Sequence, residues 1–393
     1  MIRRAAVSLV VCLVLLGAGI WLGGHPAGLP GFVRDPLVGD QDTRVVREAI
    51  DDVHGTYYRA IPRSELANDS IRGIVASLDD RFSHYFDPKE YAKFQQQQSG
   101  KFAGVGISVT QADAGLKIVE VFDESPAKKA GLAVGDVIVA VDGTPLKGKS
   151  NDAAVALIKG PIGSDVRLRV SHKGKEREVT VTRSTIEVPV VSSKERRVDG
   201  EKLAVIRLDQ FSSGAHGELA VALRKALRDG VKGVVLDLRG NPGGLVSEAQ
   251  LVASEFLSDG KIVTTKGRSV PTRTLDATGD PIAPKIPLVV LVDRNSASAA
   301  EIVAGALQDR DRAKLVGTRT FGKGVFQEVI ELSNGGALDI TAGQYFTPSG
   351  RNLGGKGTDT GAGLSPDVPA PDNPKTKADE SLKAALDTLA AEA

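Results

Sequence analysis

The amino-acid sequence predicts a multidomain α+β fold, in which a helical N-terminal region precedes a β-rich module and an α/β domain. The first observation is size: a chain of 393 residues, 41% of them hydrophobic, is too long to fold around one ordinary core. Second, the apolar pattern changes from helical spacing to strands at Gly104. Third, strands and helices alternate from about Leu203, which is typical of a largely parallel sheet covered by helices.

The first residues, 1–30, have the pattern of a targeting segment. Arg3 and Arg4 precede an uncharged run of 18 residues from Ala5 to Leu22. This run is long for a signal peptide and just long enough to cross a bilayer. A cleaved signal peptide and an uncleaved membrane anchor therefore both stay open. Either predicts a mature chain outside the cytoplasm, in a bacterial periplasm or cell envelope.

A helical region is expected over 36–100. Apolar residues recur at helical spacing in 43–61 and in 64–78. Asp87 followed by Pro88 is an N-cap with proline at the first helical position, so a third, short helix should follow it to about Gln97.

The β-rich module is expected over 101–186. Its strands read GVGISVT, LKIVEVF, DVIVAVDG and DVRLRVSH, with turn residues between them. A short helix at 153–159 interrupts these strands, and KGKEREVTVTR closes the module with another strand pair.

The α/β domain is expected over 187–370. Its strands read LAVIRLD, GVVLDLR, PLVVLVD and AKLVG, and its helices lie near 215–229, 245–257 and 299–308. A C-terminal helix within 371–393 then places Leu382, Leu386 and Leu389 on one face.

Charge and cysteine content exclude several classes of protein. Lys plus Arg is 50 and Asp plus Glu is 49, so neither nucleic acid nor an anionic membrane surface is indicated as a partner. The single cysteine, Cys12, leaves no disulfide framework. None of the five histidines has a second His or a Cys at metal-ligand spacing, so no metal site is predicted.

A candidate nucleophile stands before the helix at 299–308. A buried strand from Pro287 to Asp293 runs into a turn of small residues that contains Ser298. The unpaired N–H groups of a helix start favour negative charge, so the N–H of Ala299 suits an oxyanion formed when Ser298 attacks a carbonyl. Taken alone, the pattern more often marks a plain N-cap at Ser296 or Ser298.

A candidate base lies in RTFGKGVFQEV. Lys323 stands between glycines and close to Phe321, Val325 and Phe326. An amine among apolar groups loses hydration, which lowers its pKa and lets it act as a base near neutral pH. A surface lysine in a glycine turn is the ordinary alternative.

A glycine-rich loop follows the strand in LDLRGNPGGL. Such loops let the backbone approach a ligand closely. Three uses stay open for it: an oxyanion donor at the Gly243 N–H, a phosphate cradle and a plain tight turn. Neither GxGxxG nor a Walker motif is present.

The segments LDLRGNPGG, NSASAAEI and FGKGVFQ, in this order, resemble the C-terminal processing peptidases, which are tail-specific serine proteases with a PDZ domain. YFTPSGR at 345–351 and LSPDV at 364–368 also match, and the strands of the β-rich module look like the PDZ domain of these enzymes. The resemblance runs from roughly Asp79 to Val368. It implies a PDZ domain at 101–186 and a crotonase-like α/β catalytic domain at 187–370.

The resemblance also implies roles for particular residues. Ser298 corresponds to the nucleophile, Lys323 to its general base and Gln327 to the residue that orients the lysine. The backbone N–H groups of Gly243 and Ala299 correspond to the oxyanion hole. No metal or cofactor is needed for this chemistry, and Lys323 should lie buried near Ser298.

In the PDZ domain, the peptide-binding residues expected from the resemblance are Gly104, Val105, Gly106 and Ile107. Their backbone N–H groups would receive the C-terminal carboxylate of a peptide that adds as an extra strand. Binding there would gate access to the catalytic residues.

The function implied is that of an exported serine endopeptidase that uses a Ser-Lys dyad to cleave proteins near unfolded or flexible C-terminal tails ending in apolar residues. One alternative is a catalytically inactive PDZ adaptor or chaperone. Another is a Ser-His-Asp hydrolase that recruits His216 and Asp237, although no GxSxG elbow is present. A crotonase-type acyl-CoA enzyme fits the fold but neither export nor the PDZ domain. The helices at 43–61 and 379–392 leave a homodimer open.

Overall fold

The computed structural model describes residues 41–392, and the chain divides after Asp79 into two units. The expected targeting segment at 1–30 lies outside the described residues. Within the described part, no helix combines the length and the apolar character needed to cross a bilayer.

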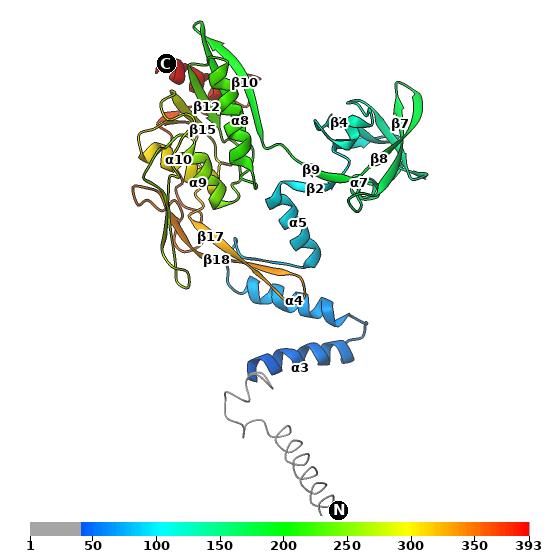
Figure 1. Ribbon diagram of the computed structural model, residues 1–393. Helices are drawn as coiled ribbons and strands as arrows, with labels where there is room; N and C mark the ends of the chain where they lie inside the picture. Colours follow the sequence, from blue (N-terminus) through cyan, green and yellow to red (C-terminus); the bar gives the residue numbers. More distant parts are fainter. Residues whose placement is uncertain (1–40, 393) are drawn as a thin grey trace, which may run out of the picture. The chain divides into compact units, whose positions relative to one another are not determined.

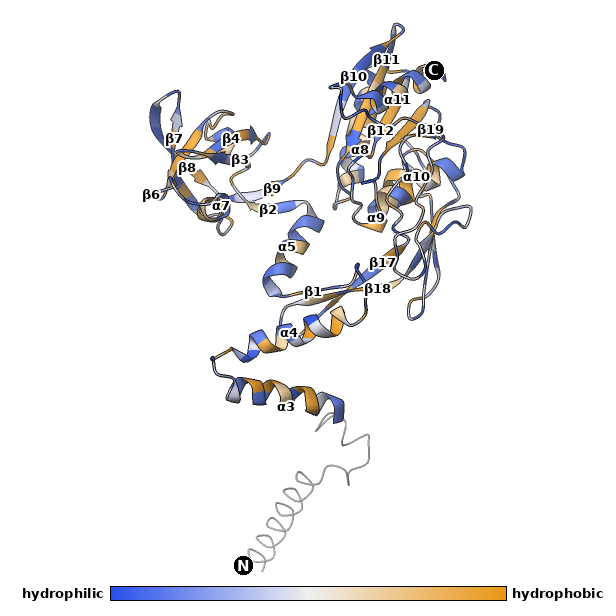
Figure 2. Ribbon diagram, turned by 180° about the vertical axis from the view of Figure 1, so that it is seen from behind, coloured by the Kyte–Doolittle hydropathy of each residue, from blue (hydrophilic) through white to orange (hydrophobic). Residues whose placement is uncertain are grey.

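The first unit contains two helices joined by a short connection, α3 (Gln41–Thr56) and α4 (Arg63–Ala76) (Figure 1). Both were expected from the sequence, although α3 ends sooner than predicted. Apolar side chains of the two helices line a groove of about 520 Å³. The hydropathy colouring shows hydrophobic positions along both α3 and α4 (Figure 2). Several of them stay exposed: Val45, Val46, Val53 and Ile74.

The second unit begins with a short strand and a helix. Strand β1 (His84–Phe86) precedes α5 (Pro88–Ser99). The side chain of Asp87 accepts hydrogen bonds from the N–H groups of Lys89 and Glu90, and Pro88 occupies the first helical turn. This confirms the helix start predicted from the Asp-Pro pair.

The β-rich module consists of one antiparallel sheet with the strand order β3-β4-β5-β7-β8, and β6 pairs with β5. Two short helices pack on it, and a separate pair, β2 and β9, joins the two ends of the module. The strands are β2 (Lys101–Gly104), β3 (Ile107–Ala112), β4 (Gly115–Val121), β5 (Val137–Val141), β6 (Thr144–Pro145), β7 (Asp165–His172), β8 (Lys175–Thr182) and β9 (Ser184–Glu187). The helices are α6 (Pro126–Lys129) and α7 (Asn151–Ile158).

The α/β part is built on a six-stranded sheet with the order β10-β11-β12-β15-β16-β19. All neighbours pair in parallel except β10 and β11, which are antiparallel. The strands are β10 (Val191–Val198), β11 (Glu201–Leu208), β12 (Gly233–Asp237), β15 (Leu288–Val292), β16 (Lys314–Gly317) and β19 (Val368–Pro369).

Helices cover both faces of this sheet (Figure 1). Alternate strand residues face opposite sides, so Val234 and Val290 pack into one core whereas Val235 and Val289 pack into the other. The first core receives α8 (Ala215–Arg228), α9 (Val246–Ser254) and α10 (Ala299–Asp309). The second receives α11 (Glu380–Ala390).

A second sheet, which is antiparallel, has the order β1-β18-β13-β14, and β17 also pairs with β18. Its remaining strands are β13 (Lys261–Gly267), β14 (Arg273–Asp276), β17 (Val325–Glu331) and β18 (Ala337–Phe346). The sequence did not predict that a strand as early as β1 would join it. The whole arrangement confirms the multidomain α+β fold, including the largely parallel sheet expected from about Leu203.

Candidate active site

Three loops meet at one edge of the six-stranded sheet. Residues 238–244 follow β12, residues 293–298 follow β15, and residues 318–324 follow β16. These strands are consecutive neighbours and parallel, so their carboxyl ends lie together, where ligands of such sheets bind. The three loops carry Gly243, Ser298 and Lys323.

Hydrogen bonds tie the three loops to one another. The Ser296 hydroxyl donates to the carbonyl of Leu238 (2.8 Å), and the Gly240 N–H donates to Asp293 Oδ1 (2.9 Å). The Phe321 N–H donates to the carbonyl of Ser296 (3.0 Å). Ser296 is fully buried: its hydroxyl joins the loop after β15 to the loop after β12, and its backbone carbonyl joins it to the loop after β16.

Ser298 occupies the N-cap position of α10 with φ 55° and ψ −115°. A non-glycine residue at this positive φ is strained by about 1–3 kcal/mol, and such strain concentrates at functional sites. The Ser298 carbonyl accepts from Ile302 N–H (2.9 Å), and its N–H donates to Glu301 Oε2 (3.0 Å). Local bonds thus hold the strained conformation. Ser298 is thus the N-cap residue of α10 and also the candidate nucleophile.

Glu301 joins the serine turn to the lysine loop. Its side chain is fully buried, and Oε2 accepts from the N–H groups of both Ser298 and Lys323 at 3.0 Å each. Oε1 accepts from the Gly322 N–H (2.8 Å) and the Thr320 hydroxyl (2.6 Å). The amide nitrogens of Ser298 and Lys323 therefore lie within two hydrogen-bond lengths of each other. Burial raises the pKa of Glu301, and these hydrogen bonds oppose the rise.

Lys323 is partly buried, and its amine is held by one side chain. Nζ donates to Gln327 Oε1 at 2.7 Å, and the ring centroid of Phe82 lies 5.0 Å from Nζ. Gln327 lies on β17, so the strand that follows the loop orients the amine. Within residues 41–392, the hydrogen bond of Lys323 Nζ is the one to Gln327, and none joins it to Ser298 Oγ.

Burial lowers the pKa of the Lys323 amine, as the sequence predicts for a lysine among apolar residues. The negative charges of Asp339, Asp80 and Glu301 oppose this effect, but the net shift is downward. A larger fraction of Lys323 is therefore neutral near physiological pH than of an exposed lysine.

Gly243 lies directly against the serine turn. It has φ 100°, and a Cβ there would lie 2.8 Å from both the Ala297 carbonyl oxygen and Ser298 Cβ, and 2.9 Å from Ala299 N. Only glycine fits this approach. The Gly243 N–H donates to Asn241 Oδ1 (2.8 Å), so this predicted oxyanion donor already has a partner.

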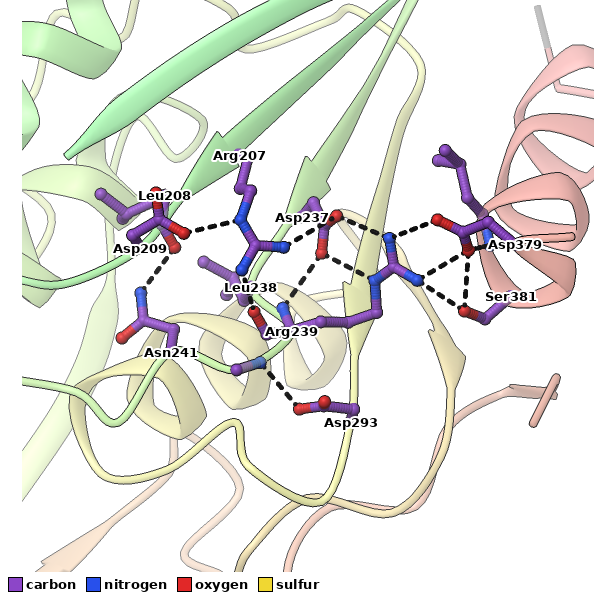
Figure 3. A network of polar contacts seen from close by, with 12 residues as sticks. Arg207, Leu208, Asp209, Asp237, Leu238, Arg239, Asn241, Asp293, Asp379 and Ser381 are labelled. Atoms are coloured by element: carbon purple, nitrogen blue, oxygen red, sulfur yellow. Dashed lines mark hydrogen bonds and ion pairs between the residues drawn. The ribbon is translucent and has the colours of Figure 1, made fainter. Parts of the chain in front are cut away.

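Asn241 fixes the shape of the glycine loop. Its side chain is fully buried, and Nδ2 donates to the carbonyl of Leu208 (2.8 Å) (Figure 3). Its backbone carbonyl accepts from the Ala297 N–H (3.0 Å). One asparagine thus connects β11, the glycine loop and the residue before Ser298.

An ion-pair network anchors the strand end before the glycine loop (Figure 3). Arg239 donates to both carboxylate oxygens of Asp237 (3.0 and 2.8 Å), to Asp379 (2.7 Å) and to Ser381 (2.8 Å). Burial lowers the pKa of Arg239, but Asp237 and Asp379 more than offset this and keep it above its ordinary value. Arg207 donates to the Arg239 carbonyl (3.0 Å). The C-terminal segment is thereby fastened beside the site.

The residues of the proposed Ser-His-Asp alternative have other partners. His216 Nδ1 contacts Glu248 Oε2 (2.9 Å), and Glu248 also accepts from the His216 N–H at the start of α8. Asp237 is bound by Arg239. Among residues 41–392, no group of three or more His, Cys, Asp or Glu side chains is placed to hold a metal ion.

The predicted peptide-binding residues of the β-rich module lie at the end of an open groove. Strand β3 is at the edge of its sheet, so its outer side is free to pair with another strand. A cavity of about 330 Å³ is lined by β3, α7 and the preceding loop. Its lining includes Gly104, Val105, Gly106, Ile107, Val155 and Ile158.

Reasoning from the sequence missed Glu301 and Asn241. The segment from Ser298 to Glu301 fits the capping-box pattern, in which a glutamate three residues after the cap binds the cap N–H, so this signal was available. The further bonds of Glu301 to Gly322 and Lys323 carry no local signal, because those residues are distant in sequence.

Comparisons with known proteins show the family to which the chain is related. The model of peptidase family S41 matches residues 202–370, and the PDZ domain model matches residues 103–182. A carboxy-terminal-processing protease of Bartonella bacilliformis is 37% identical over 80% of this chain and 71% of its own length. A carboxyl-terminal-processing protease of Synechocystis is 35% identical over 86% of this chain and 83% of its own. The solved structure of a photosystem II D1 C-terminal processing protease is 31% identical, covers 87% of this chain and 90% of its own, and has a TM-score of 0.48.

The Glu301 carboxylate is expected to stabilise the folded site. The change Glu301→Gln replaces one acceptor oxygen with a donor that faces N–H groups, and we expect it to lower the free energy of unfolding by about 1–3 kcal/mol. Urea unfolding measures the change. The control is Glu328→Gln, which alters an exposed glutamate of β17. Equal unfolding midpoints for the two variants would contradict the role given to Glu301.

Proposed function

Because the chain belongs to peptidase family S41, together with the carboxy-terminal-processing proteases, and is a serine peptidase, we propose that Ser298 and Lys323 form its catalytic dyad and that it cleaves proteins near their C-terminal tails. The observation that carries the proposal is the bridge made by Glu301. One carboxylate oxygen binds the amides of both residues and brings together two loops that are far apart in sequence.

In the proposed reaction, neutral Lys323 takes the proton from Ser298 Oγ as the oxygen attacks the peptide carbonyl carbon. The N–H of Ala299, at the start of α10, stabilises the oxyanion. The protonated amine then gives its proton to the leaving peptide nitrogen as the C–N bond breaks, which leaves an acyl-enzyme. Water, deprotonated by Lys323, hydrolyses the ester and restores Ser298. No metal or cofactor takes part.

The second oxyanion donor requires a rearrangement in this proposal. The Gly243 N–H must exchange Asn241 Oδ1 for the substrate oxygen, and Lys323 Nζ must approach Ser298 Oγ. We therefore infer that the described conformation is a resting one, which substrate binding converts to the active arrangement.

We further propose that the PDZ domain, taken as 101–186, binds the substrate's tail and gates the catalytic domain, taken as 187–370. The free edge of β3 supports addition of a peptide strand. The apolar side chains of Ile107, Val155 and Ile158 favour an apolar last residue. The proposed organisation also includes a helical region at 36–100 and a C-terminal helix at 371–393. The exposed apolar faces of α3 and α4 support a homodimer as part of this proposal.

Export belongs to the same proposal. The segment at 1–30 would direct the chain out of the cytoplasm, into a bacterial periplasm or cell envelope, either as a cleaved signal or as an anchor. The inactive adaptor stays the alternative function. It is disfavoured because Ser298, Lys323 and Gln327 are all present and Lys323 is bound to Gln327.

Loss of either dyad residue is expected to abolish proteolysis. The substrate is an unfolded protein with an apolar C-terminal tail, and its degradation is followed on gels for Ser298→Ala and Lys323→Ala. We expect kcat/KM to fall at least about 1,000-fold in each, because the nucleophile or its base is gone. Ser258→Ala and Lys266→Ala, which change exposed residues, should degrade the substrate like wild type. Full activity of both dyad variants would refute the assignment.

The rate should also report the protonation state of Lys323. A base acts only when neutral, and the neutral fraction rises as pH passes through the pKa from below. Burial lowers the pKa of Lys323, so kcat/KM is expected to rise with pH to a midpoint below the ordinary lysine value. Lys323→Arg, which stays charged, should be inactive across the whole range. A pH-independent rate would exclude lysine as the base.

Tail binding is expected to depend on α7. A glutamate at Val155 would put a charge into the apolar groove, so Val155→Glu should weaken binding of a fluorescent peptide with an apolar C-terminal residue at least about tenfold. Leu157→Glu, on an exposed position of the same helix, is the matched control. Fluorescence anisotropy gives both affinities.

The proposal that the PDZ domain gates the catalytic domain has its own test. It is contradicted if deletion of 101–186 leaves the rate of proteolysis and the tail preference unchanged.

A further inference from the structure

Arg81 lies close to the proposed catalytic base, although it belongs to the segment before β1. Its guanidinium carbon Cζ is 5.4 Å from the ring centroid of Phe82 and 5.9 Å from that of Phe321. The Phe82 ring centroid is in turn 5.0 Å from Lys323 Nζ. The Arg81 guanidinium and the Lys323 amine are therefore no more than about 10 Å apart.

Hydrogen bonds hold the segment that carries Arg81 against the antiparallel sheet. Asp80 Oδ1 accepts from the Phe82 N–H (2.9 Å), and Asp80 Oδ2 accepts from the Ser83 hydroxyl (2.5 Å). The Thr341 N–H on β18 donates to the Ser83 hydroxyl oxygen (3.0 Å). The path of the backbone around Arg81 is thereby fixed, and the carboxylate next to it in sequence is engaged by other groups.

The far end of the Arg81 side chain reaches a glycine-rich segment at 354–363. Nη1 of Arg81 donates to Thr360 Oγ1 (3.0 Å). The next residue, Gly361, donates its N–H to the carbonyl of Gly322 in the lysine loop (2.9 Å). The guanidinium therefore lies where the segment before β1, the glycine-rich segment and the lysine loop come together.

The positive charge of Arg81 has no ion-pair partner among residues 41–392. Its hydrogen bond within that range goes to the uncharged hydroxyl of Thr360. A guanidinium stays charged at physiological pH and carries five N–H donors in a planar fork that matches a carboxylate. Arg81 is exposed, whereas Phe82 and Phe321 are partly buried. The two rings hold the guanidinium at the surface, and its remaining donors are available to a ligand.

The proposed reaction relates Arg81 to the leaving part of the substrate. Protonated Lys323 gives its proton to the leaving nitrogen, so the chain that follows the cleaved bond starts beside this amine. Phe82 contacts the amine and Arg81 contacts Phe82. An extended chain spans about 3.3–3.6 Å per residue, so roughly three residues cover the distance from Lys323 to Arg81.

We propose that Arg81 is a specificity-determining residue, which binds a carboxylate of the substrate within about three residues after the cleaved bond. The proposal rests on the proposed Ser298–Lys323 dyad. Guanidinium–carboxylate pairs form charge-assisted and often bidentate hydrogen bonds, which gives this contact both strength and direction. The carboxylate is either the C-terminus of a short released tail or the side chain of an aspartate or glutamate in that tail.

The test compares peptides that differ only in this carboxylate. The full chain first cleaves a peptide with an apolar C-terminal residue, and mass spectrometry locates the cleaved bond. One pair then carries Asp or Asn at each of the first three positions after that bond. A second pair ends at the third position with a free carboxylate or an amide. For wild type, we expect kcat/KM to be about tenfold higher for the acidic member of at least one pair.

In Arg81→Gln, the preference for the acidic member should fall to about one. Arg81→Lys keeps the charge without the planar fork, so its preference should lie between those of wild type and Arg81→Gln. The PDZ domain is the same in all these enzymes, so only the part of the preference lost on substitution is assigned to Arg81. The Asp/Asn pair and the carboxylate/amide pair distinguish a side chain from a C-terminus as the ligand.

The control is Arg228→Gln, which changes an exposed arginine at the end of α8 and should keep the wild-type preference. A purely structural role for Arg81 would change the rates for both members of a pair equally. A wild-type preference of about one in both pairs, or an unchanged preference in Arg81→Gln, would therefore overturn the proposal. Failure of the dyad is recognised separately, because Lys323→Ala would then keep its activity.

Discussion

The buried carboxylate of Glu301 is the contact on which the geometry of the site depends. Its four hydrogen bonds join the start of α10, where Ser298 is held in a strained conformation, to the loop that carries Lys323. A buried charge is costly unless every lone pair is used, and here backbone N–H groups and one hydroxyl use them. Because the partners are mostly backbone atoms, the carboxylate fixes the path of both loops.

The environment of Lys323 balances two opposing effects. Burial favours the neutral amine that a general base requires, whereas the carboxylates of Asp80, Asp339 and Glu301 favour the ammonium form. Burial dominates, so the pKa of Lys323 lies below its ordinary value, as the proposed role of a general base requires. In the described conformation, Gln327 holds the Lys323 amine and Asn241 holds the Gly243 N–H.

Segments from both ends of the chain complete the site. Residues 80–86 pack against Lys323 through Phe82 and reach Gln327 through Thr341. At the other side, Asp379 and Ser381 bind Arg239, which stands just before the glycine loop. The loops at the sheet edge are thereby braced by segments far away in the sequence.

The sequence by itself determined the class of fold and which residues are candidates for the reaction. Periodicity located most helices and strands, because each carries its own apolar pattern, and the motifs around Ser298, Lys323 and Gly243 are local. It also contained the Ser298–Glu301 capping pattern. Only the tertiary structure decided that Glu301 reaches Lys323, that Asn241 occupies the Gly243 N–H, and that Ser83 binds Thr341, the partner of Gln327. These contacts join residues far apart in the chain, and their geometry depends on how the two sheets pack, which no local pattern encodes.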